Sequence, residues 1–219
     1  MGAKTWMLVY ANGDAREILK SRPGLDREAT LALANRLFPN ERLEPLEDGC
    51  LTCTNPPDGE IVIGCFPGVA ILAAKEAAVD RPSGIDPALV DPALGTTIYS
   101  HAMHSVVDWF AFSVRAGGKL LRSFSVSPDS EIMEDIGAKL PFEAPFWAGE
   151  RPAIDPEEED ASDYPLPFHP LEMGEAALLE LFGYQLEGPM IDSALESDSV
   201  PLMRFKRRVK PGNRWWKFW

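Results

Sequence analysis

The sequence has few of the residues and motifs from which catalytic sites are usually built. It contains three histidines and three cysteines among 219 residues. It has no G-x-S-x-G nucleophile elbow and no glycine loop of the kind that cradles phosphates. A small, odd number of cysteines argues against a disulfide framework and is typical of a reducing compartment. We therefore do not expect a hydrolase that forms a covalent intermediate, or a nucleotide-binding enzyme.

Long hydrophobic runs are also missing. The apolar run from Trp6 to Tyr10 is much shorter than the core of a signal peptide or a membrane span. We therefore expect a cytoplasmic location. With 45% apolar and 25% charged residues, the composition is that of an ordinary globular protein.

Negative charge dominates, but the end of the chain is basic. The net charge is −13, from 21 basic and 34 acidic residues, and seven of the basic residues lie in 200–219, which holds no acid. The rest of the chain therefore carries 14 basic and 34 acidic residues, a charge of −20 against +7 for this end. Such a body repels phosphates, so nucleic acid or an anionic membrane would be reached only through the tail.

Capping residues predict the helices. Asp14 would cap a short helix that runs to about Lys20, and Asp26 a second helix that ends before Pro39. A third helix should begin at Pro170 and continue to about Leu186.

Alternating and β-branched segments predict the strands. We expect a strand over 4–11, a hairpin of 60–66 and 69–75 around Pro67-Gly68, and a hairpin of 108–115 and 119–127. Residues 131–135 read as a short acidic turn, and 140–147 as an apolar stretch that packs onto the body. Hairpins outnumber crossovers, which indicates an α+β fold with a mixed or mainly antiparallel sheet and helices packed on one face.

The same patterns predict one globular domain over residues 1–190. Within it, 150–168 is acidic and proline-rich, and is predicted to be a flexible loop. Residues 191–219 are predicted to be a linker followed by a basic, aromatic tail.

One segment concentrates residues that could carry chemistry. His101, His104 and Asp108 lie within eight residues, and His169 could join them from the proline-rich region. Imidazoles with a carboxylate suit a divalent metal such as Zn, or a general base held by its partner. On a strand, however, His101 and His104 would point to opposite faces, so the segment must bend for the side chains to meet. Buried histidines bonded to backbone carbonyls are the structural alternative.

The cysteines form a second, weaker candidate. Cys50 and Cys53 make a C-x-x-C pair, and Cys65 follows twelve residues later. These thiols could contribute to a structural zinc site or a redox site. A second C-x-x-C is missing, and ordinary packed or exposed thiols are the simpler interpretation. No cofactor is predicted beyond this option of a divalent metal.

Aromatic and basic side chains are the candidates for partner binding. Trp109 and Trp147 could anchor a partner, and the tail interleaves cations with aromatic rings. Such a tail could contact an anionic membrane, stack on nucleic acid or fold back on the acidic body. The tail candidates are Arg207, Arg208, Trp215, Trp216 and Trp219.

Several strings together resemble a known family. They are 1–10 (MGAKTWMLVY), 65–68 (CFPG), the histidine segment through Phe112, 127–130 (SPDS), 140–150 (LPFEAPFWAGE) and 164–172 (YPLPFHPLE). They are similar to a family of soluble proteins of high-GC Gram-positive bacteria that is classed as a domain of unknown function. The resemblance spans about residues 1–190 and implies no activity, cofactor or catalytic residue.

The sequence thus favours a non-catalytic cytoplasmic protein that binds a partner, most simply another protein. The first alternative is a hydrolase, metal-dependent or not, built on His101, His104, Asp108 and His169. The second is association with a membrane surface through the basic tail. The oligomeric state is left open.

Overall fold

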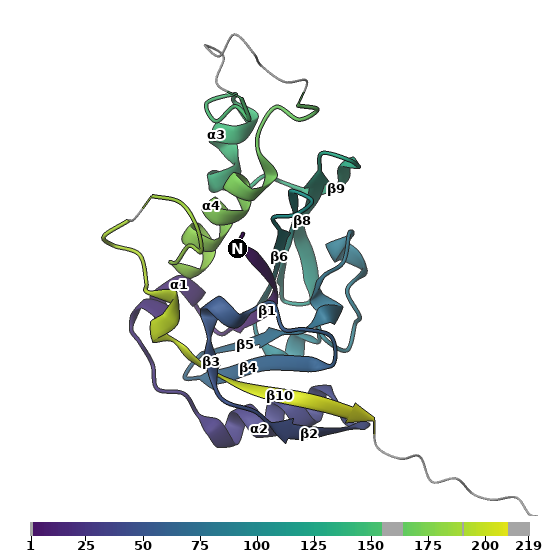
Figure 1. Cartoon of the computed structure of the whole chain (residues 1–219), viewed down its shortest axis with the longest axis vertical. Coiled ribbons are helices and arrows are strands. Elements are labelled where there is room, and N and C mark those ends of the chain that lie inside the picture. Colours follow the sequence, from purple (N-terminus) through teal and green to yellow (C-terminus); the bar gives the residue numbers. More distant parts are fainter. Residues whose placement is uncertain (1, 155–163, 190, 210–219) are drawn as a thin grey trace, which may run out of the picture.

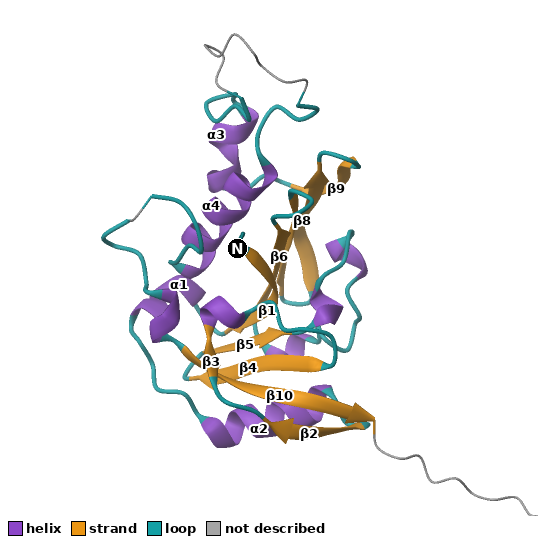
Figure 2. Cartoon of the chain, viewed as in Figure 1, coloured by secondary structure: helices purple, strands orange, loops and turns teal. Residues whose placement is uncertain are grey.

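A computed structural model describes residues 2–154, 164–189 and 191–209 (Figure 1). Two helices follow the first strand, the strands β2 to β9 then follow one another with short 3-10 turns among them, and two further helices precede the last strand (Figure 2). The helices are α1 (Ala15–Lys20), α2 (Arg27–Leu37), α3 (Ala144–Trp147) and α4 (Pro170–Phe182). The strands are β1 (Lys4–Ala11), β2 (Glu41–Pro45), β3 (Gly49–Cys50), β4 (Glu60–Phe66), β5 (Val69–Ala73), β6 (Thr97–His104), β7 (Trp109–Ala116), β8 (Lys119–Ser127), β9 (Glu131–Gly137) and β10 (Pro201–Val209).

The described strands form one ten-stranded sheet. Its order is β2-β10-β4-β5-β1-β6-β7-β8-β9, with β3 paired to β10, and every pair is antiparallel. The α+β class and the mainly antiparallel sheet are therefore confirmed. Neighbours along the chain often pair in space, because hairpins need only short connections.

Local signals place most elements where they were expected. Asp14 accepts a hydrogen bond from the Glu17 amide at the start of α1, and Asp26 accepts one from the Ala29 amide at the start of α2. The β4–β5 hairpin turns at Pro67-Gly68, where Gly68 has a φ of 82° that a side chain would disfavour. The β7–β8 hairpin is also present.

The sheet carries helices on both faces. Alternate residues of each strand point to opposite sides, so Met7 and Leu8 enter different clusters. The cluster of Met7 includes residues of α1, α3 and α4, whereas the cluster of Leu8 includes residues of α2. The expectation of helices on one face thus holds for α1, α3 and α4, while α2 lies opposite.

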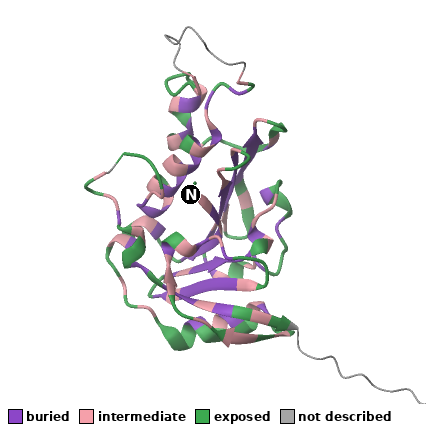
Figure 3. Ribbon diagram, in the orientation of Figure 1, coloured by how far each residue is buried: buried purple, intermediate pink, exposed green. Residues whose placement is uncertain are grey.

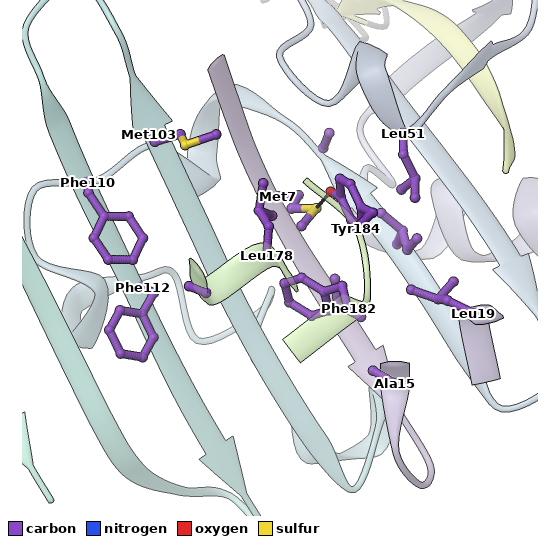
Figure 4. Packing of buried hydrophobic residues seen from close by; sticks show 14 of the residues in the cluster. Met7, Ala15, Leu19, Leu51, Met103, Phe110, Phe112, Leu178, Phe182 and Tyr184 are labelled. Carbon is purple, nitrogen blue, oxygen red and sulfur yellow. Dashed lines mark hydrogen bonds between the residues drawn. The ribbon is translucent and has the colours of Figure 1, made fainter. Parts of the chain in front are cut away.

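The larger cluster joins the sheet to α4. Phe110 and Phe112 of β7 lie beside Leu178 and Phe182 of α4, and the Tyr184 hydroxyl is 3.5 Å from the Met7 sulfur (Figure 4). Burial is concentrated in the central strands and the inner side of α4 (Figure 3). Burying this apolar surface is the main force that holds α4 on the sheet.

Three expectations differ from the structure. Residues 131–137 form edge strand β9 instead of a turn, because they pair with β8. Helix α4 ends at Phe182, four residues early, where Gly183 takes the left-handed conformation. The strand β10 runs to Val209 between β2 and β4, in a region predicted to be linker and tail. The core of the predicted acidic loop, 155–163, and residues 210–219 lie outside the described residues.

No helix within the described ranges is long and apolar enough to cross a bilayer.

Candidate functional site

The histidine segment does not converge on one site. His101 and His104 both lie in β6 and point to opposite faces of the sheet. His101 is fully buried, and its Nε2 donates to the carbonyl oxygen of Gly174 in α4 at 2.9 Å. Burial lowers the pKa of His101 to about 4, so the ring is neutral at pH 7. This is the structural alternative, a packed histidine bonded to a backbone carbonyl.

His104 lies at the end of β6 and contacts different residues. Its ring stacks on Trp6 with centroids 6.3 Å apart, and its Nδ1 accepts from the Val106 amide at 3.3 Å. Desolvation, Lys4 and Lys75 lower the pKa of His104. His104 therefore stabilises the start of the β6–β7 turn, away from His101.

The structure does bring Asp108 and His169 together. The Asp108 carboxylate lies 3.6 Å from Nε2 of His169, which caps the start of α4. The Nδ1 of His169 accepts from the Leu171 amide at 3.3 Å, and Tyr164 stacks on the ring at 5.7 Å. Both nitrogens of His169 thus face partners within the fold. The contact fastens the β6–β7 turn to α4.

The predicted metal ligands do not gather. Among the described residues, no group of three or more His, Cys, Asp or Glu side chains could hold a metal ion. The three cysteines are free thiols. Cys50 lies 3.0 Å from the Thr52 hydroxyl, and burial raises the pKa of Cys65 on β4. Neither metal hypothesis, on the histidine segment or on the cysteines, gains support from this arrangement.

The two predicted tryptophan anchors are engaged inside the fold. Trp109 is only 9% exposed, in a small cluster with Ala102 and Ala111. Trp147 donates to Glu143 at 3.4 Å and lies under the Lys139 ammonium, 3.8 Å from the ring centroid. Their indole rings therefore stabilise this chain.

The two tail arginines within the described residues are engaged as well. Arg207 pairs with both oxygens of Glu41 at 2.7 Å and with Glu76 at 2.7 Å, and it lies over the Phe38 ring. Arg208 contacts Glu44 at 3.4 Å. Trp215, Trp216 and Trp219 lie outside the described residues.

The described structure has a cavity that was not predicted. It is an open groove of about 660 Å³ along α4. One wall comes from residues within 142–151, another from residues within 185–189 and Ile191, and the floor comes from α4 with Ala3 and Arg16. Its apolar lining includes Phe142, Pro145, Phe146, Leu171, Ala176, Leu179, Pro189 and Ile191.

A buried ion pair positions the first wall. The Arg122 guanidinium on β8 donates two hydrogen bonds to Glu143, at 2.9 and 2.6 Å, and both side chains are fully buried. Glu143 also accepts from the Leu140 amide at 2.7 Å. Because an unpaired buried charge is strongly destabilising, this pair holds the segment of Phe142 and Phe146 in place.

Glu175 of α4 positions the second wall. Its two carboxyl oxygens accept from the amides of Leu186 at 2.7 Å and Glu187 at 3.1 Å. Burial, with the charge of Glu187, raises the pKa of Glu175 to about 7. The helix pattern identified α4, but nothing in the sequence indicated that Glu175 would meet residues beyond the helix end.

The comparisons with known proteins give one match, and it covers residues 5–205. The chain belongs to DUF6928, a family of unknown function. This confirms the resemblance to a domain of unknown function. No curated protein and no solved structure matches the chain.

The DUF6928 match extends from β1 into β10. It thus includes a strand beyond residue 190, where the sequence resemblance ended. It also includes both walls and the helix of the groove, and leaves out Ala3. The groove is therefore built almost wholly from the family's own domain.

Proposed function

We propose that this DUF6928 protein is a non-catalytic, cytoplasmic binding protein, and that the groove along α4 holds its ligand. The observation that carries the proposal is the groove itself, about 660 Å³ between one wall that is held by a buried ion pair and another that is held by hydrogen bonds to Glu175. Pockets for small molecules are commonly about 300–1,000 Å³, mostly apolar, with a few placed polar groups. The size and lining thus favour a small ligand.

The contacts that hold the two walls in place support the proposal of a preformed binding site. The Arg122–Glu143 pair fixes the wall of Phe142 and Phe146, and Glu175 fixes the wall of Leu186 and Glu187. A preformed site avoids much of the entropy cost of ordering its walls when the ligand arrives. A rigid groove therefore suits recognition of a small molecule.

The hydrolase alternative has weaker support. Of its four residues, only Asp108 and His169 meet. Nε2 of His169 lies 3.6 Å from the Asp108 carboxylate, and Nδ1 accepts a hydrogen bond from the Leu171 amide. A general base needs a nitrogen within reach of the proton that it removes. His101 is fully buried, so neither of its nitrogens can reach a substrate.

A protein partner and a membrane surface are the remaining alternatives. Both rest on the aromatic and basic side chains. Of these, Trp109, Trp147, Arg207 and Arg208 are engaged within this chain. The rest, in 210–219, lie outside the described residues. The groove is thus the better supported site.

Blocking the groove tests the proposal. Ala176 lines it from α4, so Ala176→Trp would fill it with an indole ring. Ala32→Trp on the exposed side of α2 is the matched control, since it adds the same ring on the other face of the sheet. Each protein is incubated with the small-molecule fraction of a bacterial extract, and the retained compounds are identified by mass spectrometry.

We expect the wild type and Ala32→Trp to retain the same compounds and Ala176→Trp to lose them. Circular dichroism of each variant verifies the fold. Equal retention by all three proteins, or retention by none, would contradict a ligand site in this groove.

A further inference from the structure

Two glutamates lie close together at one part of the groove. Glu175 and Glu187 both line it, the Glu187 amide donates to the Glu175 carboxylate at 3.1 Å, and the charge of Glu187 adds to the effect of burial on the Glu175 carboxyl group. Among the described residues, no cation forms an ion pair with either of them. Glu175 is half-buried and Glu187 is exposed. Like charges that lie close together repel each other, and a cation beside both relieves the repulsion.

The other charged side chains that line the groove are also mainly negative. Four glutamates line the groove, against two arginines. Arg16 pairs with Glu180 at 3.2 Å, which leaves Arg151 against Glu172, Glu175 and Glu187. A ligand that carries negative charge would thus meet an excess of carboxylates, whereas a cation would be attracted.

The other part of the lining is apolar. Phe142 and Phe146 of the first wall and Leu171 and Leu179 of α4 all line the groove. Such side chains favour an aliphatic or aromatic group, because its burial removes apolar surface from water. The groove is therefore suited to a molecule with two ends of different character.

We propose that the ligand is an amphiphilic amine, with its ammonium group at Glu175 and Glu187 and its apolar part along Phe142, Phe146 and α4. This inference rests on the proposed function and names the chemical class of its ligand. The carboxylates supply charge-assisted hydrogen bonds to the ammonium, and the rings and leucines bury its chain.

The Glu175 carboxyl group gives this proposal a second readout. An ammonium beside it favours the charged form, so binding near pH 7 releases protons and tightens as pH rises from 6 to 8. The charged and titratable groups that line the groove with Glu175 or interact with it are Glu172 and Glu180 on α4, His169 at its N-cap, Arg16 on α1, Arg151 after α3, and Tyr184 and Glu187 after the helix. Glu175→Gln leaves all of them in place, and should remove the pH dependence if Glu175 causes it.

Three small molecules with the same number of carbon atoms separate the contribution of charge to binding from that of hydrophobic burial. Hexylamine, hexanol and hexanoate are titrated into the full-length protein by calorimetry at pH 8. We expect hexylamine to bind at least about tenfold tighter than hexanoate, a typical effect of a partly desolvated charge contact. Glu187→Gln should weaken hexylamine binding about three- to tenfold and leave hexanol within about twofold.

Glu28→Gln on α2 is the matched control, because it removes one exposed carboxylate on the opposite face of the sheet. It should leave hexylamine binding unchanged. A comparable loss in Glu28→Gln and Glu187→Gln would mean that hexylamine responds only to the total charge, and would overturn the proposal.

The remaining outcomes distinguish this inference from the function on which it rests. If hexanol and hexanoate bind as tightly as hexylamine, and all are lost in Ala176→Trp, the groove is a binding site and the amine is the wrong ligand class. The same conclusion follows if no probe binds while Ala176→Trp still loses compounds retained from the extract. If hexylamine binds equally to Ala176→Trp, both proposals fail.

Discussion

The Nε2 atom of His101 in β6 donates a hydrogen bond to the carbonyl oxygen of Gly174 in α4, at 2.9 Å. Gly174 makes this approach feasible, because a Cβ atom there would lie 3.0 Å from the Met103 sulfur and 3.1 Å from a Phe110 ring carbon. The contact ties the helix that lines the groove to the centre of the sheet. It also removes His101, one of the candidate catalytic histidines, from any open site.

The buried His101 should make the protein sensitive to acid. Its pKa in the fold is about 4, below the ordinary 6.5, so the unfolded chain binds a proton more readily. The stability that this group contributes is therefore present above pH 6.5 and is lost as pH falls towards 4. A shift of this size corresponds to about 3 kcal/mol in the free energy of unfolding.

Urea unfolding of the wild type and His101→Gln at pH 7 and pH 4.5 tests this. Glutamine keeps a donor for the Gly174 carbonyl but does not titrate, so His101→Gln should lose less stability between the two pH values. The pKa of the half-buried His104 is lowered as well, so the comparison variant His104→Gln should lose less stability than the wild type but more than His101→Gln. An equal loss in His101→Gln would show that other groups cause the acid sensitivity.

Glu175 should make the stability of the protein change with pH in the opposite direction. Its pKa is raised to about 7, so the folded protein binds this proton more readily than the unfolded chain. The stability from this group is present below its ordinary pKa and is lost as pH rises through 7. The melting temperature of the wild type relative to Glu175→Gln should thus fall between pH 5 and pH 8.

Differential scanning calorimetry at several pH values checks this trend. Glu172→Gln, an exposed neighbour on the same helix, should give a curve parallel to that of the wild type. Parallel curves for Glu175→Gln as well would exclude Glu175 as the origin of the trend.

The parts of the fold that the sequence predicted depend on short-range signals. The caps Asp14 and Asp26 and the turn at Pro67-Gly68 act within a few residues, so they can be recognised without knowledge of the partner. β10 was missed because its basic side chains suggest a solvated tail. Arg207 belongs in the sheet because Glu41 and Glu76, more than a hundred residues earlier, neutralise it.

The candidate site was predicted less well, for the same reason. The sequence indicated that His101 and His104 would point apart if they lay on one strand, and β6 contains both. It also offered His169 as a partner for the segment, and His169 lies 3.6 Å from Asp108. The groove depends on contacts between distant segments, such as that of Arg122 with Glu143. Composition and periodicity carry no information about which distant carboxylate meets which amide or guanidinium.

The buried pair Arg122–Glu143 should be among the most costly contacts to break. Glu143→Gln leaves the buried guanidinium without its main counter-charge, although Asp135 still contacts it. We expect the free energy of unfolding to fall by about 3 kcal/mol or more, as for other buried pairs that lose one partner. The wall of Phe142 and Phe146 should loosen with it.

A double-mutant cycle in urea measures the coupling. Arg122→Met with Glu143→Gln removes both charges, so the double variant should be more stable than the sum of the single losses implies. Hydrogen exchange of 140–147 reports the loosening of the wall. Strictly additive losses would mean that the two side chains contribute independently.

Asp108 should stabilise the fold through its backbone conformation as well as through its charge. Its φ is 46°, a left-handed conformation that Asp and Asn tolerate better than other residues with a side chain. Its contact with His169, at 3.6 Å between half-exposed groups, contributes little by comparison. We therefore expect Asp108→Ala to lower the free energy of unfolding by about 1 kcal/mol and Asp108→Asn by less than half of that. Urea unfolding at pH 7 measures both, and an Asp108→Asn loss as large as that of Asp108→Ala would show that the charge contact with His169 dominates instead.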